Sequence, residues 1–158
     1  MYDVIVVGAG PAGATLARLL DEKFKTLVID KKRENGGFQK PCGGLLAPRA
    51  QRAIAELEDT LPKDVLVDPQ IFAVETIDLK TGKTRYYPRE YVNMDRHKFD
   101  LWLKSKIRKN ADVEYGVVTA IEKIENGYEV TWSDETGEVK KGARKISRGR
   151  GRGAFVRS

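Results

Sequence analysis

The sequence predicts an α/β fold that opens with a strand, a helix and a second strand, and later adds an antiparallel β layer. The first observation is an apolar, β-branched run at 2–8 that ends in a glycine-rich turn. The second is a helical pattern followed by another apolar run at 25–30. The third is a series of short strand-like runs between 113 and 146. A strand–helix–strand start of this kind is typical of a parallel sheet.

Each element of the opening unit follows from a local pattern. The run YDVIVVG at 2–8 indicates a buried parallel strand, because its apolar residues continue without alternation. The helix is expected at 11–23, since Pro11 suits a first turn, where its missing N–H would have no partner anyway. The run KTLVID at 25–30 indicates the second strand, and 31–48, with four glycines and two prolines, is expected to be a loop.

The middle of the chain predicts a helix and a hairpin. The helix is expected at 47–57 with one apolar face, formed by Ala50, Ala53, Ile54 and Leu57. A strand at 70–79, a KTGK turn at 80–83 and a strand at 84–88 together predict a β-hairpin.

The next part of the chain predicts another helix and then several strands. The helix is expected at 94–107, with Asp95 as its N-cap and with three residues facing inward, Phe99, Leu103 and Ile107. Two or three strands are expected at 113–134, with a hairpin turn at Asn126-Gly127, and a further strand at 138–146.

Three glycines follow the first strand in the spacing G-x-G-x-x-G. Gly8 permits a tight turn, Gly10 lets a pyrophosphate approach the backbone, and Gly13 lets the helix and the strand pack closely. The helix N-terminus supplies N–H groups and a partial positive charge. Asp30, at the end of the second strand, is placed to accept both ribose hydroxyls and to repel a 2′-phosphate. These residues predict a dinucleotide site on a Rossmann-like domain, and they leave FAD and NAD both open.

Composition narrows the class of protein. Hydrophobic residues make up 41% and charged residues 33% of the 158, which fits one globular domain. There is no run of 18 apolar residues, so we expect no membrane span. The first strand begins close to Met1, which leaves no room for a signal peptide, and the single Cys42 cannot form an internal disulfide. We therefore expect a cytoplasmic protein.

Three segments resemble one family of flavoproteins. The segment DVIVVGAGPAGATLARLL is similar to the N-terminus of FAD-dependent oxidoreductases of the para-hydroxybenzoate hydroxylase superfamily. The segment KPCGGLLAP at 40–48 resembles the geranylgeranyl reductase group, in which a Cys-Gly motif lies near the flavin. The segment MDRHKFDLWL resembles that group's Arg-x-x-Phe-Asp segment, whose arginine contacts FAD. The resemblance covers roughly residues 2–146.

The resemblance implies FAD as the cofactor and a definite set of contacts. It places Ala12 at the pyrophosphate, Asp30 at the adenosine ribose and Arg96 at phosphate or ribityl oxygens. It also places Cys42 and Gly43 beside the flavin and the Val118 backbone beside the adenine. The full set of expected cofactor-binding residues is Gly8, Gly10, Ala12, Gly13, Asp30, Cys42, Gly43, Arg96 and Val118.

The implied activity is that of a flavin-dependent oxidoreductase, in which the flavin transfers a hydride or electrons. A prenyl chain or another apolar molecule is the implied substrate, with a nicotinamide or ferredoxin-type electron donor. No catalytic residue is identified beyond Cys42, a candidate through its place near the flavin. The residues alone leave simpler interpretations open, in which Arg96 is a solvated helix residue and Cys42 a small buried thiol. His97 is expected on the helix surface and not at a metal.

The tail differs from the rest of the chain. Residues 140–158 hold eight of the 29 basic residues and no acidic residue, which leaves 21 basic and 23 acidic residues in 1–139. We therefore predict two parts: an FAD-binding domain at 1–146, incomplete at its C-terminus, and an aberrant, disordered Arg/Gly-rich tail at 147–158.

A shifted reading frame is the expected origin of this tail. In the superfamily, a segment like Tyr-Leu-Val-Gly-Ala-Asp-Gly-Ala follows the added strands, and alternating arginine and glycine codons read one base later permit it. We therefore interpret the tail as a frameshift product and expect the chain that ends in it to be inactive. Two other functions stay open: a nucleotide-binding module without turnover, and an arm that binds nucleic acid through phosphate contacts.

Overall fold

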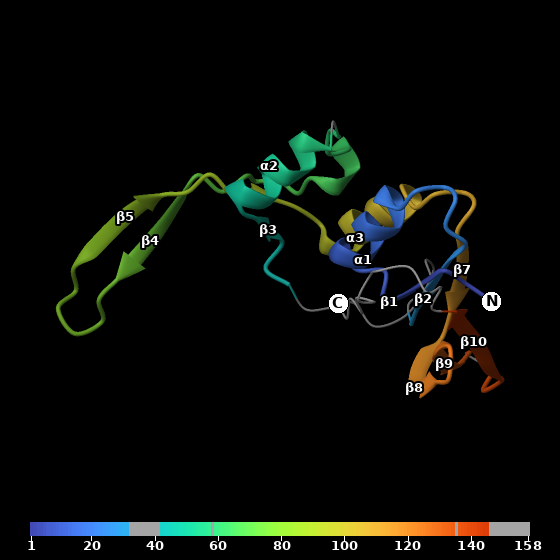
Figure 1. Cartoon of the computed structure of the whole chain (residues 1–158). Coiled ribbons are helices and arrows are strands. Elements are labelled where there is room, and N and C mark those ends of the chain that lie inside the picture. The colour runs from blue at the N-terminus through green and yellow to red at the C-terminus, as the bar shows by residue number, and fades with distance from the viewer. Residues whose placement is uncertain (32–41, 58, 135, 146–158) are drawn as a thin grey trace. The chain divides into compact units, whose positions relative to one another are not determined.

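The computed structural model describes residues 1–31, 42–57, 59–134 and 136–145 (Figure 1). The described residues fall into two compact units, one within 1–38 and 100–158 and the other within 39–99. The predicted Arg/Gly-rich tail at 147–158 lies outside the described residues, as does most of the expected loop at 31–48. Among the described residues, no helix is long and apolar enough to cross a bilayer.

The first unit is built on a three-stranded parallel sheet (Figure 1). Strands β1 (Val4–Val7), β2 (Thr26–Asp30) and β7 (Asp112–Tyr115) lie in the order β1-β2-β7. All five residues of β2 are buried, because this strand is paired on both edges. In β1, by contrast, Val6 alone is buried, which corrects the expectation of a fully buried first strand. The reason is its position, since no described strand pairs with its outer edge.

Helix α1 (Pro11–Leu19) follows β1 and starts at the predicted residue. Its small residues Ala14 and Ala17 are fully buried, and Ala17 packs with Val6 and Val28 in one core cluster. The helix ends four residues earlier than expected. Leu20 already has an extended backbone, and Asp21 then closes a turn by accepting the N–H of Lys23 at 3.0 Å.

The antiparallel layer of the first unit consists of β8 (Val117–Ile124), β9 (Gly127–Ser133) and β10 (Val139–Lys145), in the order β10-β9-β8. Val130 and Trp132 of β9 pack with Leu27 and Ile29 of β2 in a second core cluster. The hairpin turn between β8 and β9 lies at Glu125-Asn126, one residue earlier than predicted, because Gly127 already pairs with Ile124. The predicted strand at 138–146 is confirmed by β10.

Helix α3 (Arg96–Ser105) confirms the predicted cap. The carboxylate of Asp95 accepts the N–H of Lys98 at 3.0 Å, as an N-cap does. Phe99 and Leu103 are 5% and 6% exposed, and Ile107 packs partly buried beside the cluster of Val6 and Val28. The inward positions Phe99 and Leu103 of the helix are therefore confirmed, whereas Ile107 lies beyond its end, because the helix is shorter than the predicted 94–107.

The second unit contains two small antiparallel pairs and two helices. Strand β3 (Leu45–Leu46) pairs with β6 (Val92–Asn93), and β4 (Ala73–Ile77) pairs with β5 (Thr84–Pro88) in the predicted hairpin. Helix α2 (Pro48–Glu56) and the short 3₁₀ helix η1 (Lys63–Val65) complete it. No residue of α2 is buried, so its predicted apolar face does not lie in a core.

Candidate functional site

The turn after β1 has the conformation that its first glycine predicts. Gly8 has a φ of +93°, which L-residues rarely adopt and glycine, without a Cβ atom, adopts readily. Its N–H donates to the carbonyl of Ile29 at 2.7 Å, so the turn is joined to the end of β2. The turn therefore lies at the carboxyl edge of the parallel sheet, where open α/β sheets bind ligands.

The third glycine of the motif is required by packing. A Cβ atom on Gly13 would lie 1.9 Å from the carbonyl oxygen of Gly8 and 3.3 Å from a methyl carbon of Val6. A backbone atom cannot turn aside as a flexible side chain can. Helix α1 thus approaches the turn closely because residue 13 has no side chain.

Among the described residues, no side chain caps the N-terminus of α1. Its N-cap, Gly10, makes no side-chain cap hydrogen bond, and the first turn holds no acidic residue. Pro11 has no N–H, so Ala12 and Gly13 carry first-turn N–H groups that lack an intrahelical partner. Together with the helix dipole, these groups suit a pyrophosphate.

Asp30 ends β2 at the same edge, as predicted. The residues that contact it were not predicted. The residue is 8% exposed, and its Oδ2 lies 2.5 Å from Nζ of Lys104 on α3. Its backbone carbonyl accepts the N–H of Gly116 at 2.9 Å. The acidic residue is therefore a buried member of an ion pair.

The second unit holds the other expected flavin contacts. Cys42 is exposed, which excludes the interpretation of a buried thiol. Nη1 of Arg96 lies 4.0 Å from its sulfur. A Cβ atom on Gly43 would meet no atom within 4 Å. The structure thus brings together the Cys-Gly and Arg-x-x-Phe segments within one unit.

Val118 lies at the start of β8, two residues after Gly116. Its side chain packs against the cluster of Leu27, Ile29, Val130 and Trp132. The hydrogen bond from Gly116 to Asp30 places the entry to β8 at the carboxyl edge of β2. The register between β8 and β9 also shifts between Val118 and Ala120.

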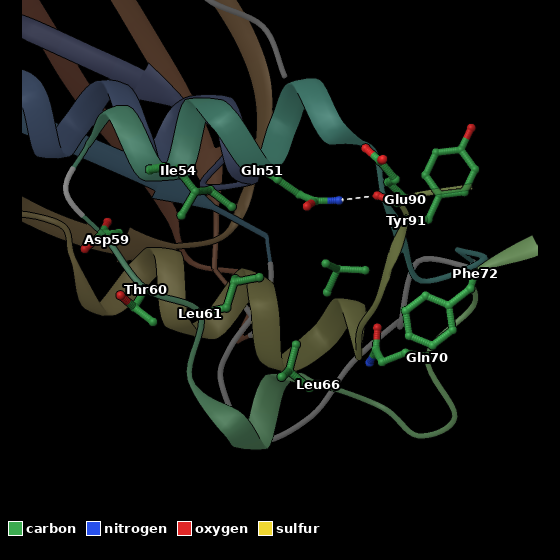
Figure 2. Close-up of a pocket in the computed structure, with 12 residues that line it drawn as sticks. Gln51, Ile54, Asp59, Thr60, Leu61, Leu66, Gln70, Phe72, Glu90 and Tyr91 are labelled. Atoms are coloured by element: carbon green, nitrogen blue, oxygen red, sulfur yellow. Dashed lines mark hydrogen bonds between the residues drawn. The ribbon is translucent and has the colours of Figure 1, made fainter. Parts of the chain in front are cut away.

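A separate pocket of about 600 Å³ lies within the second unit (Figure 2). Its walls are mostly apolar, with Ile54, Leu61, Leu66 and Phe72 among them. Gln51, which lines the pocket, donates to the carbonyl of Glu90 at 2.7 Å (Figure 2). It also donates to the carbonyl of Leu46 at 2.9 Å. None of the predicted site residues lines it.

Sequence reasoning missed Lys104, the partner of Asp30. The one sequence feature that could have drawn attention to Lys104 is its place directly after the inward-facing Leu103. That feature does not identify Asp30, which is distant in the sequence, as its partner. His97 is partly exposed on α3, and the described residues include no group of three or more histidine, cysteine or acidic residues able to hold a metal ion.

Comparison with known proteins supports the nucleotide-binding fold. Residues 6–39 match a family model described as an NAD(P)-binding Rossmann-like domain. The protein CbrA of Escherichia coli (strain K12) is 51% identical over 114 residues, which cover 71% of this chain and 32% of that protein. The chain therefore spans about a third of the length of this curated relative.

Solved structures share the fold at lower identity. A triple mutant of the flavin-dependent brominase Bmp2 matches with a TM-score of 0.68 and 21% identity, over 91% of this chain and 37% of that one. The flavin-dependent monooxygenase PieE, in complex with FAD and substrate, matches with a TM-score of 0.65 and 16% identity, over 91% of this chain and 29% of that one. The predicted fold class, a Rossmann-like α/β domain with an added antiparallel layer, is confirmed.

Proposed function

We propose that this chain forms the FAD-binding part of a flavin-dependent oxidoreductase. The observation that carries the proposal is one edge of the parallel sheet. The Gly8 turn and the N-terminus of α1 lie there, and β2 ends there in the carboxylate of Asp30. This is the chemistry that a dinucleotide requires, with N–H groups for its phosphates and an acceptor for its ribose.

Two observations favour FAD over a nicotinamide dinucleotide. The solved proteins of similar fold reported above are flavin-dependent enzymes, and one of them holds FAD. In addition, the Cys-Gly segment and Arg96, which resemble flavin-contacting segments, lie together in the second unit. The first unit would hold the adenosine diphosphate half of the cofactor.

Within this proposal, each chain residue has a binding task. The N–H groups of Ala12 and Gly13 donate to the pyrophosphate, and Oδ1 of Asp30 accepts from a ribose hydroxyl. The guanidinium of Arg96 donates paired hydrogen bonds to phosphate or ribityl oxygens. Bound FAD would supply hydride or electron transfer, which no side chain of this site can perform.

The proposal also extends to the class of substrate. The segments KPCGGLLAP and MDRHKFDLWL resemble the geranylgeranyl reductase group, and we propose reduction of a prenyl or other apolar double bond as the reaction. The electrons would come from a nicotinamide or a ferredoxin-type donor. This chain matches about a third of the length of CbrA. The activity, substrate and partners of that longer protein are therefore not assigned to this chain.

The nucleotide that the purified protein retains tests the proposal. The chain is purified, incubated with FAD, FMN or NADH, and passed through a desalting column, after which the retained nucleotide is identified by chromatography. We expect FAD to co-elute with the protein and FMN to be lost, because FMN lacks the adenosine half that the Asp30 edge binds. Retention of NADH with loss of FAD would instead indicate a nucleotide-binding module without a flavin. Retention of neither would contradict dinucleotide binding.

A further inference from the structure

Asp30 and Lys104 form an ion pair that is almost shielded from water. The carboxylate Oδ2 lies 2.5 Å from the ammonium Nζ, and the two side chains are 11% and 10% exposed. Two charged groups leave water at a high cost unless each compensates the other. An uncompensated carboxylate at this depth would be unfavourable, so Lys104 supplies the charge balance that Asp30 needs.

The ion pair occupies one carboxylate oxygen and leaves the other available. Oδ2 of Asp30 is the oxygen that faces Nζ of Lys104. A carboxylate has about four acceptor sites, so Oδ1 can accept from a ribose hydroxyl while Oδ2 keeps its lysine.

The backbone around this pair is also held. The carbonyl of Asp30 accepts the N–H of Gly116, and Leu103, next to Lys104, is 6% exposed. The backbone of Asp30 is thus held by Gly116, directly after β7, and Lys104 presents its ammonium to the carboxylate from α3.

We propose that Lys104 is a positioning residue, whose ion pair with Asp30 holds the carboxylate in the orientation that accepts the ribose hydroxyls of the adenosine half. This inference rests on the proposed FAD function. It assigns part of the recognition of the ribose to α3, an element outside the strand–helix–strand unit that carries the glycine motif.

The test uses two probes and a matched set of variants. The probes are FAD and its 2′-deoxyadenosine analogue, titrated by flavin fluorescence. Lys104→Met removes the charge at similar length, Lys104→Arg keeps it, and Lys109→Met removes an exposed lysine just beyond the same helix. Circular dichroism checks that each variant is folded.

We expect the unaltered protein and the Lys109→Met control to bind FAD about tenfold more tightly than the deoxy analogue, as a charge-assisted hydrogen bond implies. In Lys104→Met this ratio should fall close to one, and Lys104→Arg should restore most of it. A Lys104→Met protein that is folded and keeps the full ratio would overturn the inference.

The charge left on Asp30 can also unfold Lys104→Met, so Lys104→Gln serves as a second variant. Glutamine can still donate one hydrogen bond to the carboxylate but carries no charge. A lowered ratio in Lys104→Gln, with Lys104→Arg near the original value, supports the inference, and an unchanged ratio in Lys104→Gln overturns it. If the unaltered protein binds no FAD, the proposed function fails and this inference with it. If it binds FAD and Lys104 has no effect on the ratio, the inference alone fails.

Discussion

Nη1 of Arg96 lies 4.0 Å from the sulfur of Cys42, at the outer limit of a hydrogen bond to sulfur. The two residues come from different segments of the chain, and each was assigned to the FAD site through its own motif. Cys42 is exposed and Gly43 has open space around it. The exposed thiol, the nearby arginine and the space beside Gly43 fit the proposed approach of a planar ring.

Replacing Arg96 should weaken FAD binding. Arg96→Met removes paired hydrogen bonds to phosphate or ribityl oxygens, and hydrogen bonds to charged groups contribute about 1.5–3 kcal/mol. We expect a loss of about tenfold or more in affinity, measured by fluorescence titration. Arg96→Lys should restore little, because an ammonium cannot reproduce the planar fork. Arg52→Met, at an exposed position of α2, is the charge-matched control, and an equal loss in both variants would contradict a specific role.

Replacing Gly13 should damage the fold and the site together. In Gly13→Ala the new methyl would lie 1.9 Å from the carbonyl oxygen of Gly8, so α1 must move away from the turn. Strain of this kind costs about 1–3 kcal/mol of unfolding free energy. Urea denaturation measures the loss, and Gly43→Ala, which meets open space, should leave the transition in place. Equal stability of Gly13→Ala and the original protein would show that the close approach is not required.

Asp30→Ala should lower both stability and FAD affinity. The substitution removes the carboxylate that faces the buried ammonium of Lys104, and breaking a buried ion pair costs about 3–5 kcal/mol. The ribose contact, at about 1.5–3 kcal/mol, is lost in addition. Thermal unfolding without ligand separates the first effect from the second, which a titration of the folded protein measures. Unchanged affinity in the folded variant would remove Asp30 from the site.

Local patterns were sufficient for most of the fold. The apolar runs at β1 and β2, the proline at the start of α1 and the Asp95 cap of α3 are set by neighbouring residues, so the sequence predicts them well. The errors arose where distant parts of the chain decide. The burial of β1 depends on whether a strand pairs with its outer edge. Helix α2 buries no residue, although its apolar residues are spaced to share one face.

The sequence predicted which residues form the candidate site, but it did not predict which residues contact them. The glycine motif carries its own geometry, because φ at Gly8 and the close approach at Gly13 are properties of the turn itself. The ion pair of Asp30 with Lys104 joins β2 to a helix much later in the chain. No periodicity or spacing links those two residues, so the pair could be found only from the structure.

The origin of the tail at 147–158 stays a prediction, since these residues lie outside the described part of the chain. Coding DNA read one base later from Lys145 onward should encode a segment like Tyr-Leu-Val-Gly-Ala-Asp-Gly and continue as a flavoprotein. Sequencing the locus checks this directly. A shifted frame that soon reaches a stop codon, with no such segment in either alternative frame, would contradict the frameshift interpretation. Steep loss of RNA affinity with rising salt would then favour the nucleic-acid alternative.

The most direct test of the dinucleotide site is a titration of FAD into the original protein and into Gly10→Val. Gly10 has a φ of −69° and a ψ of −175°, which any L-residue adopts, so valine should leave the backbone undisturbed. Its side chain should fill the space that a pyrophosphate needs at the N-terminus of α1. We predict saturable quenching of flavin fluorescence in the original protein and none in Gly10→Val, with identical circular dichroism spectra. A folded Gly10→Val protein that binds FAD as tightly as the original would contradict the assignment of this loop as the phosphate site.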